Sequence, residues 1–153
     1  MNLYEKLSSE ALANGLEVIE LPLEHSDGMV CGNLIGIRTG QTSTEKACVL
    51  AEEIAHARYT VGNFLDQSST ANRKQEHLAR VVAYDRMIGL ARLVEAFRHG
   101  CRNQYEMAEY LDVPEPFLAE ALECYRQKYG TGVTCGGFTI RFEPCLSVSM
   151  MME

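Results

Sequence analysis

The sequence lacks the features of a membrane-spanning or a secreted chain. It has no uninterrupted apolar run near the ~18 residues that a helix needs to cross a bilayer. Its first residues, Met-Asn-Leu-Tyr-Glu-Lys-Leu, do not show the basic and then apolar layout of a signal peptide. We therefore expect a cytoplasmic protein with no membrane partner.

Positive charge is also scarce. The chain has 14 Lys and Arg residues against 21 Asp and Glu residues, which gives a net charge of -7. A protein that binds DNA or RNA directly needs clustered Lys and Arg to contact the phosphates. The charge balance argues against such a surface, and we expect no direct nucleic-acid partner.

No two cysteines form a C-x-x-C pair, so the sequence gives no support for a thiolate zinc site. The chain contains six cysteines at scattered spacing, namely Cys31, Cys48, Cys101, Cys124, Cys135 and Cys145. Without a signal peptide, this spacing does not indicate a disulfide framework. We expect reduced cysteines that pack as small apolar residues.

No internal repeat, low-complexity run or linker divides the chain. Its 153 residues suit one domain with a sizeable core, and a hydrophobic content of 46% is ordinary for a globular protein. We therefore expect a single domain over residues 1–153.

Local patterns predict an α+β fold, because some segments show helical spacing of apolar residues and others alternate apolar with polar residues. Helices are expected at residues 3–12, 44–59, 72–97, 104–111 and 116–129, and strands at residues 16–21, 29–37 and 133–142. Thr42 and Glu45 have the spacing of a capping box, and residues 61–71 have the composition of a loop. The N-terminal strands should form a small sheet packed on a mainly helical body.

The second predicted helix contains a short charged motif. Residues 51–56 read Ala-Glu-Glu-Ile-Ala-His, which is the zinc-protease signature H-E-x-x-H with Glu52 in place of the first histidine. In the intact signature, two histidines at i and i+4 bind zinc and the glutamate activates a water molecule. Glu52 and His56 keep the i, i+4 relation, and Glu53 holds the position of the general base. Because carboxylate oxygens also bind zinc, Glu52 is a candidate metal ligand.

Helical geometry alone leaves two interpretations of this motif. The expected core stripe of the helix consists of Ala47, Leu50, Ile54 and Ala57. At ~100° per residue, Glu52 and His56 lie ~40° apart around the helix axis, and Glu53 lies ~60° beyond His56. All three point away from the centre of the core stripe. This arrangement suits a metal site, and it suits a solvated charged flank equally well.

A candidate third ligand lies on the next predicted helix. Glu76 is one turn before Ala79, at the start of an apolar stripe that begins with two alanines. Small alanines let helices approach closely, so a Glu76 carboxylate could reach a metal ion that is held by His56. A glutamate at the start of a helix is also a favourable charge in its own right. Asp66, in the predicted loop, is the alternative third ligand.

These two segments resemble the ImmA/IrrE family of metallopeptidases, and in particular its small members from Gram-positive phages and integrative elements. The resemblance is carried by residues 50–56, by residues 72–76 and by the alanine-spaced helix that follows to Ile88, and it extends loosely from residue 16 to about residue 129. It implies a zincin-like body in which His56 and Glu76 bind zinc and Glu53 is the base. Glu52 departs from the family pattern, which has histidine at this position.

The resemblance also implies a function. The best-known members of the family cleave a partner repressor and so switch on mobile-element or stress genes. We therefore expect a zinc-dependent endopeptidase whose substrate is a protein, a helix-turn-helix repressor of a phage or mobile element. The alternative is a non-catalytic module that binds such a repressor and has a degenerate metal site. The oxygen-rich set of Glu52, His56 and Glu76 could also accept manganese or iron in place of zinc.

Overall fold

The computed structural model describes residues 1–59 and 70–151, which form two compact units, Met1–Ala83 and Tyr84–Glu153. Helix α3 (Thr70–Met87) begins in the first unit and ends in the second. Helices are combined with two three-stranded sheets, which confirms the α+β class predicted from the sequence. Within these residues, no helix is both long and apolar enough to cross a membrane. The single domain expected from the sequence stays a prediction.

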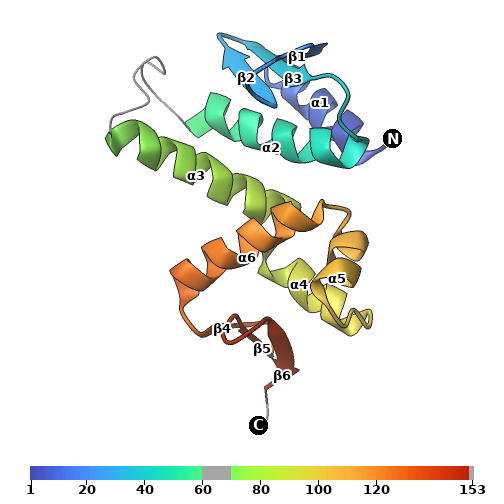
Figure 1. The fold of residues 1–153 in the computed structure, drawn as a ribbon, viewed down its shortest axis with the longest axis vertical. Coiled ribbons are helices and arrows are strands. Elements are labelled where there is room, and N and C mark those ends of the chain that lie inside the picture. Colours follow the sequence, from blue (N-terminus) through green and yellow to red (C-terminus); the bar gives the residue numbers. More distant parts are fainter. Residues whose placement is uncertain (60–69, 152–153) are drawn as a thin grey trace. The chain divides into compact units, whose positions relative to one another are not determined.

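The first unit is a small sheet packed on helices, as predicted (Figure 1). Its further elements are α1 (Leu3–Ala13), β1 (Glu17–Leu21), β2 (Gly28–Cys31), β3 (Leu34–Arg38) and α2 (Ser43–Tyr59). The strands lie in the order β1-β3-β2, so β2 is at an edge of the sheet. Helix α2 packs against α1, β2 and β3, and α1 also contacts β1.

The prediction of one strand over residues 29–37 was wrong, because the chain turns back on itself within this segment. Gly32 has a φ of 61°, a left-handed conformation that glycine adopts without strain, and it allows the tight turn between β2 and β3. These two strands pair in antiparallel fashion, while β1 pairs with β3 in parallel fashion. Ile35 and Ile37 of the central strand are fully buried.

Helix α2 begins and packs largely as its sequence predicts. The Glu45 backbone N–H donates a hydrogen bond of 3.1 Å to the Thr42 hydroxyl, which is one half of the predicted capping box. The predicted stripe residues Ala47, Leu50 and Ile54 are buried, and Ala57 is only half-buried. Ala51 and Ala55 are buried as well, so the apolar face is wider than the predicted stripe.

The prediction of one long helix over residues 72–97 was also wrong. The chain breaks into α3 and α4 (Gly89–Arg98) at Ile88. Gly89 has a φ of 71°, which lies outside the right-handed helical region and is accessible to glycine at little cost. Most of the loop expected at residues 61–71, including Asp66, lies outside the described residues.

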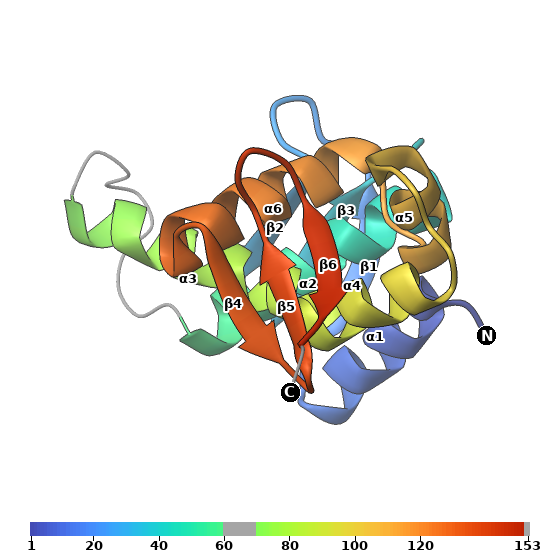
Figure 2. The ribbon, with the colours of Figure 1, turned by 90° about the horizontal axis from the view of Figure 1, so that it is seen from below.

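The second unit combines α4, α5 (Gln104–Leu111) and α6 (Glu115–Tyr129) with the second sheet. The predicted strand at residues 133–142 is a hairpin of β4 (Gly132–Cys135) and β5 (Phe138–Arg141), and β6 (Ser147–Met150) adds a third strand (Figure 2). The sequence did not predict β6, since its only buried side chain is Val148. Strand pairing with β5, and not apolar alternation, is what orders this segment.

Candidate metal centre

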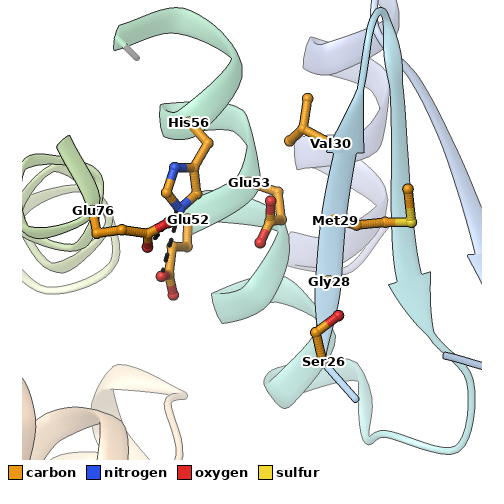
Figure 3. Close-up of a pocket in the computed structure, with 8 residues that line it drawn as sticks. All are labelled: Ser26, Gly28, Met29, Val30, Glu52, Glu53, His56 and Glu76. Carbon is orange, nitrogen blue, oxygen red and sulfur yellow. Dashed lines mark ion pairs between the residues drawn. The ribbon is translucent and has the colours of Figure 1, made fainter. Parts of the chain in front are cut away.

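An open pocket of about 350 Å³ lies in the first unit, lined by residues of α2, α3 and β2 and of the segment before β2 (Figure 3). The lining residues are Ser26, Gly28, Met29, Val30, Glu52, Glu53, His56 and Glu76. All four site residues that the motif and the second helix indicated are therefore brought together in one place. Asp66, the alternative ligand, is outside the described residues.

Helix α2 supplies three of the four site residues from the edge of its buried face. His56 is the most enclosed of them, with only 8% of its surface exposed, whereas Glu52 and Glu53 are half-buried. The i, i+4 relation puts Glu52 and His56 one above the other on the helix, and Glu53 points toward β2 (Figure 3). Helical periodicity alone thus separates a pair of candidate ligands from a candidate base.

Helix α3 brings Glu76 to His56. The Glu76 Oε2 lies 3.2 Å from the His56 Nε2, and the Glu52 Oε1 lies 3.9 Å from the same nitrogen. Figure 3 shows both carboxylates directed at the imidazole from different helices. Farther along α3, the predicted stripe residues Ala79 and Ala83 are buried.

Glu52, His56 and Glu76 could together hold a metal ion, because one ligand atom from each lies within 4.8 Å of the others. Ligand atoms at ~2.1 Å from a tetrahedral zinc ion lie ~3.4 Å apart. The His56–Glu76 distance of 3.2 Å is close to this spacing, and the Glu52–His56 distance of 3.9 Å exceeds it by about half an ångström. Two carboxylates and one imidazole also form a donor set that is chemically suited to a divalent cation.

Glu53 lies where α2 faces β2, next to Gly28. Burial raises the pKa of its carboxyl from the usual 4.5 to about 7, and the negative charges of Glu52 and Glu76 act in the same direction. His56 opposes this shift through its positive charge. Glu53 is therefore a carboxyl group that exchanges protons near neutral pH.

The pKa of His56 is raised above 6.5. The largest cause is the Glu52 carboxylate, burial acts in the opposite direction, and the charges of Glu53 and Glu76 raise the pKa further. The shorter distance is nevertheless to Glu76, so we attribute the shift to both carboxylates that face the ring. Both carboxylates thus stabilise the protonated form of the His56 ring.

The sequence did not single out Arg80, whose Nε lies 3.6 Å from the Glu52 Oε1. A signal was present, since Arg80 follows Glu76 at i+4 and must share its face of the helix. The sequence also missed the wall of the pocket that β2 forms. That wall depends on how the sheet packs on α2, which no local pattern encodes.

Comparison of the chain with models of protein families, with curated proteins and with solved structures found no significant match. The resemblance to ImmA/IrrE metallopeptidases therefore stays a prediction that rests on the motif residues. The geometry of the four residues stands apart from that resemblance, because it follows from distances in this chain alone.

Proposed function

We propose that the chain is a zinc-dependent endopeptidase in which Glu52, His56 and Glu76 hold the metal ion and Glu53 is the general base. One observation carries the proposal: three ligand atoms from two helices lie within 4.8 Å of one another, and Glu53 lines the same pocket. Three protein ligands beside an open pocket are typical of a catalytic zinc site, whereas structural sites have four.

A bound zinc ion supplies Lewis acidity, which makes a water molecule acidic near neutral pH and stabilises negative charge on a carbonyl oxygen. The chain's own contribution is to hold the donors in place. The burial of His56 restricts its ring, and the ion pair of 3.2 Å with His56 holds Glu76 against it. Both effects reduce the reorganisation that the reaction would require.

Glu53 would take the proton of the attacking water and later give it to the nitrogen of the leaving amine. A general base is most effective when its pKa lies near the working pH, because it must both accept and release the proton. Burial, which raises the pKa of Glu53 to about 7 in the metal-free protein, acts in this direction. Its place beside the ligands puts the carboxylate in the same pocket as the reacting atoms.

The position of β2 supports a polypeptide substrate. This strand lines the pocket and is at an edge of its sheet, since β3 is its neighbour on one side. The unpaired backbone groups of an edge strand can bind an extended peptide by adding it to the sheet. Met29 and Val30 would contact such a peptide beside Glu53 (Figure 3). By the resemblance above, the intact substrate would be a helix-turn-helix repressor.

A second candidate function is a non-catalytic module that binds such a repressor. The ion pairs of the site favour it, because Glu76 faces His56 at 3.2 Å and Glu52 faces Arg80 at 3.6 Å. A charged cluster that is satisfied by its own partners needs no metal to be stable.

Metal content and proteolysis together test the proposal. The protein is purified without chelators or nickel affinity, and its bound metals are quantified. It is then incubated with zinc and a proteome-derived peptide library, and with repressors encoded beside its gene, and new termini are identified by mass spectrometry. New termini with the wild type and none with Glu53→Gln would support the peptidase. A protein that binds a repressor without metal and without cleavage would support the second candidate.

A further inference from the structure

Two ion pairs join helices α2 and α3, and they lie one helical turn apart. His56 Nε2 and Glu76 Oε2 are 3.2 Å apart in the first, and Glu52 Oε1 and Arg80 Nε are 3.6 Å apart in the second. Each helix contributes residues at i and i+4, and the order of the pairs is that of antiparallel helices. Three of the four residues in these ion pairs, Glu52, His56 and Glu76, form the candidate metal group. Arg80 is the fourth, and it is not part of that group.

The Glu52 oxygen that faces Arg80 is the same atom that faces the candidate metal position. Glu52 Oε1 lies 3.9 Å from His56 Nε2 and 3.6 Å from Arg80 Nε. An arginine side chain is always charged, so it cannot yield to an incoming cation by losing a proton. A divalent ion that binds Glu52 must therefore share this carboxylate with a fixed positive charge, or displace that charge.

We propose that Arg80 competes with the divalent ion for the Glu52 carboxylate and so makes the metal group a weak, exchangeable site. This inference rests on the proposed metal-binding function of Glu52, His56 and Glu76. Without metal, Arg80 neutralises Glu52; with metal, the guanidinium is left beside a second cation and repels it. Occupancy of the site then follows the free concentration of the metal, which makes the activity of the pocket dependent on metal supply.

The replacement of histidine by Glu52 gives Arg80 its partner. A neutral imidazole at position 52 would leave the Arg80 charge unpaired beside the metal ion. Glu52 adds one negative charge to the ligands and Arg80 offsets it, so the pair leaves the net charge near the metal unchanged. The inference therefore requires that Glu52→His gain less zinc affinity while Arg80 is present than in the Glu52→His/Arg80→Gln double variant.

Metal affinity is the direct test, because it does not depend on cleavage. Zinc and manganese binding are measured by competition with chelators for the wild type, Arg80→Gln and Arg80→Lys. Removal of the positive charge of Arg80 should tighten metal binding by Arg80→Gln about tenfold relative to the wild type. Arg80→Lys keeps the charge, so its metal affinity should stay within about twofold of the wild type. Because Arg80 is 59% exposed, substitution should leave folding intact, and Arg80→Met provides a second neutral variant. The difference in metal affinity between the wild type and Arg80→Gln should shrink at high salt, since exposed charges are screened.

A matched control comes from the same helix. Lys74→Gln removes one positive charge from an exposed position of α3 that helical periodicity turns away from Glu76. It should leave metal affinity at the wild-type value. As a second readout, the Nε–H resonance of Arg80 should move in NMR spectra when the protein is titrated with zinc, which is diamagnetic. The Lys74→Gln spectrum should show the same shift.

The outcomes separate the inference from the proposed function. Equal or weaker metal binding by Arg80→Gln, with clear binding by the wild type, would overturn the inference alone. Tighter binding by Arg80→Gln with no cleavage of any substrate would support the inference and contradict the peptidase. No metal binding by the wild type or by Arg80→Gln would overturn both.

Discussion

A Cβ atom on Gly28 would lie 2.9 Å from the Glu53 Cγ and 2.6 Å from the Val49 Cγ1. Such distances are shorter than van der Waals contact, so a larger residue at this position would displace either β2 or the Glu53 side chain. The absence of a side chain on Gly28 thus lets the edge strand cover the carboxylate. This cover contributes to the burial of Glu53, and burial is the largest cause that raises its pKa to about 7.

Gly28→Ala should therefore impair catalysis without removing the metal. The added methyl group should shift Glu53 and lower cleavage at least about tenfold, as small displacements of reacting groups do. Overpacking should also cost about 1–3 kcal/mol of the free energy of unfolding. Cleavage rate, metal content and urea denaturation are measured on the same preparation. Ser26→Ala is the control, because it changes a lining residue without adding an atom against Glu53.

His56→Ala should abolish metal binding. His56 is the central donor of the group, lying between the carboxylates of Glu52 and Glu76, and the two acids alone are too few for a stable site. Metal content after dialysis against a defined zinc concentration provides the measurement. His77→Ala removes an exposed imidazole next to Glu76 and should retain the metal. A variant without His56 that still binds one equivalent of metal would contradict the assignment.

Glu76→Gln distinguishes a ligand from a charge at the start of a helix. As a helix-start charge, Glu76 would contribute only ~0.3–1 kcal/mol to stability, and metal content would hardly change. As a ligand, its loss should lower metal affinity sharply. Asp66→Asn tests the alternative third ligand from the predicted loop. Loss of metal in Asp66→Asn, with full metal content in Glu76→Gln, would show that the assignment to the second helix is wrong.

Glu53→Gln should separate metal binding from cleavage. The amide has nearly the shape of the carboxyl group but cannot accept the proton of a water molecule, so metal content should persist and cleavage should be lost. DNA binding by a candidate repressor is measured after incubation with the wild type and with the variant. Equal inhibition of the repressor by both proteins would mean that binding alone suffices, and the peptidase assignment would fail.

Local patterns predicted most of the helices and singled out four candidate residues, which line one pocket in the structure. One helical motif contains Glu52, Glu53 and His56. Glu76 was identified because it lies one turn before Ala79, where the apolar stripe of the next helix begins. Their convergence also requires that α2 and α3 bring His56 and Glu76 to within 3.2 Å of each other. The structure brings these residues together in one pocket, where the spacing alone had left a solvated charged flank as an alternative.

The errors have a common physical origin. The breaks at Gly32 and Gly89 depend on left-handed backbone conformations, which a glycine permits but does not require. Periodicity continues through both positions, so it indicated one strand and one helix where the chain has two of each. Gly28 and Arg80 were missed for a different reason, since their importance lies in contacts between elements.

The stability of the metal-free protein should fall as the pH rises through neutrality. Burial raises the pKa of Glu53 from 4.5 to about 7, and the Glu52 carboxylate is the largest cause that raises the pKa of His56 above 6.5. For both groups the folded state binds protons more tightly than the unfolded state. Their contribution to stability is therefore fully present below the unfolded pKa and is lost as the pH rises through the folded pKa.

For Glu53, this loss should amount to at most about 3 kcal/mol between about pH 5 and pH 8, at ~1.4 kcal/mol per pKa unit. Urea denaturation in the presence of a chelator measures it, and Glu53→Gln should show a flatter dependence on pH over the same interval. Zinc should reverse the trend, because its ligands must be deprotonated and it therefore stabilises the protein more at higher pH. A parallel pH dependence of the wild type and Glu53→Gln would mean that the Glu53 carboxyl is solvated, and the close cover by β2 at Gly28 could not be what tunes it.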